Sequence, residues 1–200
     1  MPPFFPSFIH CQHPKTSIKP VPNSLDRLIN HSGWWSQRKM GVGSNGMRSQ
    51  IHLDYRQTVA AHYTRQGTLH TRKLSQEIIE SCKPFLPSRN QSMSVIDGEW
   101  VPSLNHVFVF DILKFQGERL VGLTYAQRYE FLEALSKKLP EGSHISILPV
   151  YKTLDEVMAQ LDQVVENPHC EGLVFRAPDS KCWNDTSIVR CRINGHFKGR

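Results

Sequence analysis

The chain has 200 residues, which suits one domain that can bury roughly 70% of its unfolded surface without disulfide or metal support. Hydrophobic residues make up 39% and charged residues 21%, which is ordinary for a soluble globular protein, and no apolar run reaches the ~18 residues of a membrane span. The formal net charge of +6 suits a polyanionic partner such as a nucleic acid or a nucleotide.

The cysteines and the N-terminus bear on the cellular compartment. There are five cysteines, an odd number with no C-x-x-C pair, which argues against a disulfide framework or a zinc site and fits a reducing compartment. The first residues lack the basic start and long apolar stretch of a secretory signal. We therefore expect an intracellular protein, cytoplasmic or nuclear, whose source could be viral.

The first third of the chain predicts an extended segment, a short helix and several strands. Residues 1–22 are rich in proline and predict an extended lead-in. Asn23 or Ser24 could cap a short helix that has Leu25, Leu28 and Ile29 on one face. A strand at 34–40 is interrupted by GVGSNG, and two alternating segments, 49–55 and 58–65, predict an antiparallel meander because two residues join them.

The rest of the chain mixes helices with strands. Helices are predicted at 74–82, 124–138 and after Thr153, and strands at 92–96, 107–113, 145–150, 173–176 and 188–193. The pairs Thr124 with Gln127 and Thr153 with Glu156 fit capping boxes. We assign the apolar stripes of these helices to the core, and for the last helix the stripe is Leu154, Val157, Met158, Leu161, Val164 and Val165. The pattern predicts an α+β fold.

Acidic residues stand at two predicted strand ends. A strand that ends in Asp97-Gly98-Glu99 would place carboxylates at a tight turn, and Glu171-Gly172 opens an apolar strand. Two such acids could flank one hard cation, since Mg²⁺ binds few carboxylates together with phosphate and water. From the residues alone, a solvated turn remains the alternative.

An aromatic residue and a basic pair complete the candidates. Phe110 at a strand end could stack on a purine ring, or it could be an ordinary core residue. Arg190 and Arg192 share one face of the last strand and could hold phosphate, or they could form a solvated face.

Five strings in one order suggest a family. They are KMGVGSNGMR at 39–48, IDGEW at 96–100, FVFDIL at 108–113, EGLVF at 171–175 and IVRCR at 188–192. Their order and spacing resemble the covalent nucleotidyltransferase superfamily of ATP-dependent DNA ligases, RNA ligases and mRNA capping enzymes. The resemblance covers roughly residues 19–193, and the strings after Phe108 are most similar to the adenylation domain of DNA ligases.

This resemblance implies a fold, two cofactors and a role for each matching residue. The implied fold has antiparallel sheets that flank a nucleotide pocket, with peripheral helices, as in the ATP-grasp-like domain of DNA ligases, and the implied cofactors are ATP and Mg²⁺. The implied roles are nucleotidylation of Lys39, phosphate or ribose binding by Arg48 and Arg65, ribose or metal binding by Glu99, stacking on adenine by Phe110, Mg²⁺ binding by Glu171, and an α-phosphate clamp of Arg190 and Arg192. The family usually has two lysines where this chain has the last two arginines.

The lysine segment departs from the family pattern Lys-x-(Asp/Asn)-Gly-x-Arg. In one alignment, residues 41–44 are an insertion whose removal leaves KMNGMR, a good match that begins at Lys39. In the other, Gly43 stands in place of the lysine, and no covalent intermediate could form. The match after excision favours the first alignment, although the insertion could still displace the amine.

The resemblance implies an ATP-dependent polynucleotide ligase that acts on DNA, a function tied to repair, replication and recombination. The alternatives are an RNA ligase, a GTP-using capping enzyme, or a degenerate domain that binds nucleotide or nucleic acid without catalysis. The implied partners are nicked DNA or other nucleic-acid ends, with no membrane. The lead-in would occupy residues 1–22 and the nucleotidyltransferase domain 23–200. Because no room remains for an oligonucleotide-binding barrel, a partner could supply one to this monomer.

Overall fold

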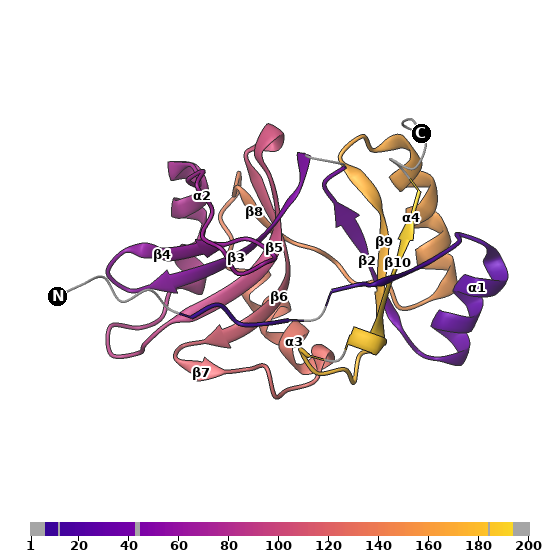
Figure 1. Cartoon of the computed structure of the whole chain (residues 1–200), viewed down its shortest axis with the longest axis horizontal. Coiled ribbons are helices and arrows are strands. Elements are labelled where there is room, and N and C mark those ends of the chain that lie inside the picture. The colour runs from indigo at the N-terminus through magenta and orange to yellow at the C-terminus, as the bar shows by residue number, and fades with distance from the viewer. Residues whose placement is uncertain (1–6, 12, 43–44, 184, 194–200) are drawn as a thin grey trace.

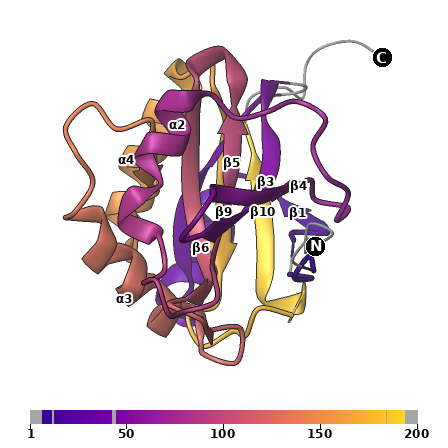
Figure 2. The same cartoon turned by 90° about the vertical axis from the view of Figure 1, so that its left-hand side faces the viewer.

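The computed structural model describes residues 7–11, 13–42, 45–183 and 185–193. Two β-sheets stand next to one another, and helices cover their outer sides (Figure 1). In the view at right angles, α2, α3 and α4 gather on one side, and β1 and β4 lie on the opposite side (Figure 2). No helix among the described residues has the length and apolar character needed to cross a lipid bilayer.

The smaller sheet joins strands from the two ends of the described chain. Its order is β1 (Thr16–Ile18), β10 (Ile188–Arg192), β9 (Cys170–Arg176) and β2 (Trp35–Met40). β1 runs parallel to β10, and the other pairs are antiparallel. Helix α1 (Pro22–Asp26), the π-helical turn Arg27–His31 and helix α4 (Leu154–Glu166) pack against this sheet through a core that includes Leu25, Val157 and Phe175.

The larger sheet contains the meander. Its order is β4 (Thr58–Tyr63), β3 (Met47–Asp54), β5 (Ser94–Val101), β6 (His106–Phe115) and β7 (Glu118–Arg119), and β8 (Ile145–Ile147) pairs in parallel with β6. Helices α2 (Gln76–Ser81) and α3 (Tyr125–Ser136) cover one face, where Ile51, Ile96 and Ile112 of the strands pack with Ile78 and Leu132. Short 3₁₀ turns at Lys83–Phe85 and Pro102–Leu104 connect these elements, and a third at Asp185–Ser187 precedes β10 of the smaller sheet.

Several local predictions are confirmed. The α+β class, the meander of β3 and β4 and the strand before the glycine-rich segment are all present. Both capping boxes form: the Thr124 and Thr153 side chains accept from the amides of Gln127 and Glu156, whose side chains bind back to the cap residues. Capping signals succeed because every partner lies within four residues.

Two helix details are wrong. α1 follows Val21, which makes no side-chain cap, and begins at Pro22 because the fixed φ of proline suits the first helical position. In α4, Val157 and Val164 are buried, whereas Met158 is 38% and Val165 63% exposed. The latter two follow the buried positions by one residue, so they lie about 100° around the helix and face outward.

Two predicted strand ends lie inside strands instead. Asp97-Gly98-Glu99 forms part of β5 and is not a turn at its end, and Phe110 lies within β6 and not at its end. Gly98 serves close packing, because a β-carbon there would lie 2.8 Å from the carbonyl oxygen of Phe108 on the neighbouring strand. Glycine in a strand is as consistent with a close backbone approach as with a turn.

A strap formed by residues 7–11 and 13–18 crosses from the larger to the smaller sheet (Figure 1). On the larger sheet, the Ile9 amide donates to Gln50 Oε1 at 2.8 Å, and Gln50 Nε2 donates to the Ile9 carbonyl at 2.9 Å. On the smaller sheet, Thr16–Ile18 forms β1 beside β10. The extended lead-in is therefore an ordered part of the fold over its described residues.

Candidate functional site

A pocket of about 330 Å³ takes its walls from both sheets and from the strap. All eight residues singled out in the sequence line it: Lys39, Arg48, Arg65, Glu99, Phe110, Glu171, Arg190 and Arg192. They come from β2, β3, β5, β6, β9, β10 and the loop after β4. The order of the strings along the chain therefore corresponds to one place in the fold.

Lys39 and Glu171 form the centre of the pocket. Lys39 is the penultimate residue of β2, and its Nζ pairs with Glu171 Oε2, while Arg192 Nε of β10 pairs with Glu171 Oε1. Burial raises the pKa of Glu171, but the charges of Lys39 and Arg192 lower it by more than burial raises it. The net pKa is therefore below the ordinary value. The absence of a side chain at Gly172 permits the close approach of β9 to β10, because a β-carbon there would lie 1.9 Å from the Cys191 carbonyl oxygen on β10.

Glu99 provides a second carboxylate on the opposite wall. Burial raises its pKa to about 7, and the charges of Lys39 and Arg48 counteract this only in part. Gly46 passes close to this carboxylate, since a β-carbon on Gly46 would lie 2.7 Å from Glu99 Oε1. The pocket thus has two acids in different states, one paired with cations and one held in a poorly solvated position.

Arg48 is engaged by a buried acid. Its Nε lies 3.1 and 3.2 Å from the two carboxylate oxygens of Asp97, and its guanidinium carbon lies 5.5 Å from the Phe110 ring centre. Arg48 therefore makes a cation–π contact with the Phe110 ring, and both side chains line the pocket.

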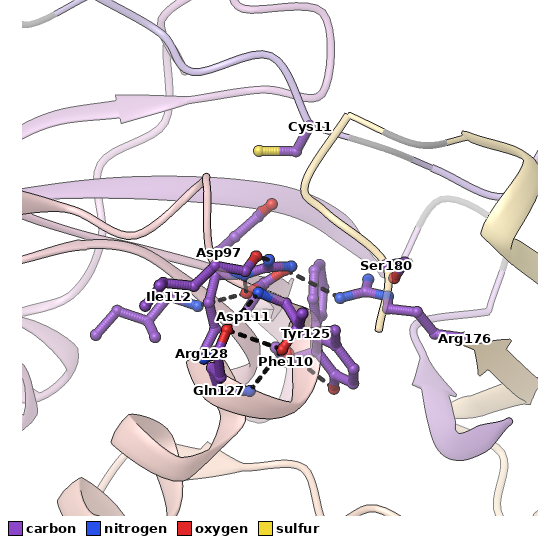
Figure 3. A network of polar contacts seen from close by, with 12 residues as sticks. Cys11, Asp97, Phe110, Asp111, Ile112, Tyr125, Gln127, Arg128, Arg176 and Ser180 are labelled. Carbon is purple, nitrogen blue, oxygen red and sulfur yellow. Dashed lines mark hydrogen bonds and ion pairs between the residues drawn. The ribbon is translucent and has the colours of Figure 1, made fainter. Parts of the chain in front are cut away.

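A buried ionic network lies behind Phe110 and was missed in the sequence (Figure 3). Asp111 accepts from Arg128 Nε at 2.8 Å and Nη2 at 3.0 Å, and from Arg176 Nη1 at 2.9 Å. Burial raises the pKa of Asp111, but the charge of Arg128 reverses this and the net pKa is lowered. The network joins α3, the larger sheet and the smaller sheet, and Arg176 also lies 6.0 Å from the Phe110 ring centre.

One signal for this network was present in the sequence. The buried stripe of α3 includes Tyr125, Tyr129 and Leu132. Arg128 has helical spacing to these residues, so it lies on the same stripe. An arginine on an apolar stripe requires a buried acid as its partner. Asp111 in FVFDIL is that acid, but 17 residues separate the pair.

A further polar chain lies beside the part of the pocket that Gln37 and Leu148 line. The Tyr125 hydroxyl donates to Gln37 Oε1 at 2.6 Å, and Gln37 Nε2 donates to the Leu148 carbonyl at 2.9 Å. Gln37 and Leu148 both line the pocket near Phe110 and Val174. This end combines apolar walls with an oriented amide, as ligand pockets commonly do.

The two described ends of the glycine-rich segment meet at one point of the pocket wall. A β-carbon on Gly41 would lie 2.4 Å from the α-carbon of Gly46, so the two α-carbons are within about 4 Å, close to the ~3.8 Å between chain neighbours. The amide of Asn45 donates to the Val42 carbonyl at 3.1 Å. This closed base supports the insertion alignment that keeps Lys39 in the pocket. Gly43, the alternative lysine position, lies outside the described residues.

The strap adds residues that the sequence did not suggest. His13 and Pro14 line the pocket, and Arg190 Nε donates to Ser17 Oγ at 2.9 Å. Arg65 and Arg190 are close enough that the charge of Arg65 contributes to lowering the pKa of Arg190, after burial and Arg192. Cations from β10 and from the loop after β4 therefore gather in one part of the pocket.

Known proteins resemble both the sequence and the fold. A sequence profile described as the ATP dependent DNA ligase domain matches residues 103–187. DNA ligase 1 of Saccharomyces cerevisiae is 34% identical over 70 residues, which are 35% of this chain and 9% of the yeast protein. The chain thus matches a small part of that relative.

Among solved structures, a mycobacterial DNA ligase D complexed with ATP and MES aligns with a TM-score of 0.62 and 16% identity, over 90% of this chain and 60% of that one. The ligase domain of LigD from M. tuberculosis gives a TM-score of 0.61 and 18% identity, over 90% of this chain and 59% of that one. The ATP-dependent DNA ligase of bacteriophage T7 gives 0.54 and 13%, over 92% and 69%. The predicted resemblance to the adenylation domain of ATP-dependent DNA ligases is confirmed, and so is the fold class.

Proposed function

We propose that this chain is the adenylation domain of an ATP-dependent DNA ligase, in which Lys39 accepts AMP from ATP and passes it to a DNA end. The observation that carries this proposal is the position of Lys39, whose amine reaches Glu171 inside a pocket that Phe110 and Glu99 also line. A volume of about 330 Å³ lies within the ~300–1,000 Å³ that small-molecule sites occupy.

The pocket residues fall into two groups, one for the adenosine part of the nucleotide and one for its phosphates. The adenine ring would lie on Phe110 near Gln37, in the apolar end, with the ribose near Glu99. The phosphates would lie among Arg65, Arg190 and Arg192, since arginine presents a fork of donors to phosphate oxygens. Arg48 would act at the ribose or phosphate edge while it remains paired with Asp97.

The reaction would proceed in three displacements at phosphorus. The Lys39 ammonium first loses a proton to solvent; the neutral amine then attacks the α-phosphorus, an N–P bond forms, and pyrophosphate leaves. An oxygen of the DNA 5′-phosphate then attacks the same phosphorus and releases the lysine. Finally, a 3′-hydroxyl attacks the 5′-phosphorus, the strand is sealed and AMP leaves. The arginines would stabilise charge on the phosphoryl oxygens, and the rigid strands would position the amine.

Glu171 and Glu99 are suited to a Mg²⁺ ion. Burial raises the pKa of Glu99 to about 7, and the negative charge of Glu171 contributes in the same direction. Two neighbouring carboxylates are oxygen ligands that a hard cation prefers beside phosphate. When bound, the ion would neutralise charge on the phosphates. In that state the described residues supply the nucleophile, Lys39, and the phosphate clamp, Arg190 and Arg192.

A DNA substrate is also part of this proposal. It rests on the profile match and on the net charge of +6. The RNA ligase and capping-enzyme alternatives differ from it in substrate or nucleotide, and the non-catalytic alternative lacks the covalent step.

Incubation with α-labelled ATP and Mg²⁺, followed by a denaturing gel, tests the proposal. We expect an acid-labile label, as a phosphoramidate gives, which Lys39→Ala abolishes and Lys181→Ala at an exposed position retains. Labelling by GTP in place of ATP would indicate a guanylyltransferase. Nucleotide binding without label in wild-type protein would leave the non-catalytic binder.

A further inference from the structure

A second hollow lies beside the nucleotide pocket. Its volume is about 1000 Å³, and its lining includes Phe8 of the strap, His52, Arg56, Lys114, Arg119 and Trp183. None of these six side chains lines the pocket that holds Lys39. We call this hollow the side groove.

The side groove and the pocket share one face of the larger sheet. Along β3, Arg48 lines the pocket, whereas His52 and Asp54 line the side groove. Side chains an even number of residues apart point to the same face of a strand, and four residues span about 13 Å. The pairing of β3 with β5 is regular from Met47 to Leu53, and β5 repeats the arrangement with Glu99 in the pocket and Val95 in the side groove.

The strap forms the ridge between the two hollows. Its Ile9 backbone is held by Gln50, which lies between Arg48 and His52 on β3. His13 and Pro14 then line the pocket, while Ser7 to His10 line the side groove. A chain-like ligand that leaves the pocket could therefore continue over this ridge on the same face of the sheet.

The lining of the side groove fits a polyanion with aromatic rings. Arg56, Lys114 and Arg119 provide three positive charges against the one negative charge of Asp54. Trp183 of the lining is 60% exposed, so its ring is open to contact with a ligand. Basic side chains along a groove together with an exposed aromatic ring are the combination that holds single-stranded nucleic acid.

We propose that the side groove binds the single strand of nucleic acid whose 5′-phosphate end enters the nucleotide pocket. Arg56, Lys114 and Arg119 would contact the backbone phosphates, and Trp183 would stack on a base. This inference rests on the proposed function, because that function places a nucleic-acid end in the pocket. It adds a path for the strand on residues that the nucleotide does not use.

Fluorescence anisotropy with a 16-nucleotide single strand tests this path. The strand has a free 5′-phosphate and a dye at its 3′ end, and binding is measured over a salt series that starts low. For Lys114→Glu with Arg119→Glu we expect affinity to fall at least about tenfold and the salt slope to decrease by roughly 1.4, the value for two lost contacts. For Trp183→Ala we expect a loss of roughly fivefold or more with the same salt slope, because stacking is not ionic.

A matched control separates a specific path from net charge. Lys137→Glu with Lys138→Glu changes the charge equally at exposed residues at the end of α3 that line neither hollow. We expect this variant to bind as wild type does. Equal loss in the control, wild-type affinity in both groove variants, or no binding by the wild type would overturn the proposal. Thermal unfolding of each variant shows whether the fold is retained.

Self-labelling from ATP distinguishes failure of this inference from failure of the proposed function. The groove variants should take label as the wild type does, since their residues lie outside the nucleotide pocket. Loss of strand binding with normal labelling supports the path. If wild type takes no label, the enzymatic proposal fails, and the anisotropy comparison still decides whether the side groove binds the strand.

Discussion

Gly41 and Gly46 meet backbone to backbone at the base of the glycine-rich segment, although four residues separate them in the sequence. β2 therefore ends and β3 begins at neighbouring points, as they would if the intervening residues were absent. This contact keeps Lys39 and Arg48 on facing sides of one pocket.

Deletion of residues 41–44 should leave labelling by ATP equal to or above that of wild type. The deletion restores KMNGMR, and the closed base of the segment means that the strands need little movement to rejoin. The measurement is label per molecule on a denaturing gel, with unfolding by urea as a check on the fold. A folded deletion variant that has lost the label would contradict the insertion alignment.

Gly46→Ala should reduce both stability and labelling. The added β-carbon would lie 2.4 Å from the Gly41 α-carbon and 2.7 Å from Glu99 Oε1. Overpacking of this kind costs about 1–3 kcal/mol, and we expect labelling to fall at least about tenfold because the wall beside Lys39 shifts. Gly122→Ala is the control, because a β-carbon there meets no atom within 4 Å. Equal behaviour of the two variants in urea unfolding would refute the close contact.

Asp111→Asn should destabilise the fold by about 3–5 kcal/mol, because it leaves Arg128 and Arg176 buried without their negative partner. The measurement is the free energy of unfolding in urea. Asp162→Asn on the exposed side of α4 is the control and should change stability by no more than about 0.5 kcal/mol. A loss below about 1 kcal/mol at Asp111 would mean that the network stabilises the protein little.

His62→Phe should make stability less sensitive to acid. Burial, with the charge of His70, lowers the pKa of His62 to about 3, against the ordinary 6.5. Between these values the unfolded chain binds a proton and the folded one does not, so stability falls by about 1.4 kcal/mol per pH unit as pH decreases below 6.5.

The phenylalanine should keep the stacking on His70, whose ring centre lies 4.0 Å away. At pH 7.5 it should not destabilise, because both ring nitrogens of His62 are buried without a hydrogen-bond partner in the described part of the chain. Urea unfolding at pH 7.5, 6 and 5 measures the slope, and the exposed His31→Phe variant should match the wild type. An unchanged slope in His62→Phe would show that this histidine does not titrate as described.

Local signals in the sequence were sufficient for much of the fold. The caps at Thr124 and Thr153 and the alternation around Ile51 depend on residues that are close in the chain, so they predicted α3, α4 and β3. Glycine was harder to interpret. In Asp97-Gly98-Glu99 it suggested a turn, but its requirement comes from the neighbouring strand, which the local sequence does not reveal.

The candidate site was predictable only through motif order. Eight residues from the five strings and the loop after β4 line one pocket, although nothing local links Lys39 to Glu171, which are 132 residues apart. The partners of Asp111 and the course of the strap could not be predicted, because they depend on tertiary contacts rather than on a local pattern. The side groove was missed for the same reason.

The strap also has a consequence for the order of folding. Ser17 contacts Arg190 across 173 residues of sequence, so this wall of the pocket can form only after both segments have been synthesised. Contacts of such long range carry a large loop-closure cost and tend to form late. We expect the pocket to gain its full wall only when β1 pairs with β10, late in folding.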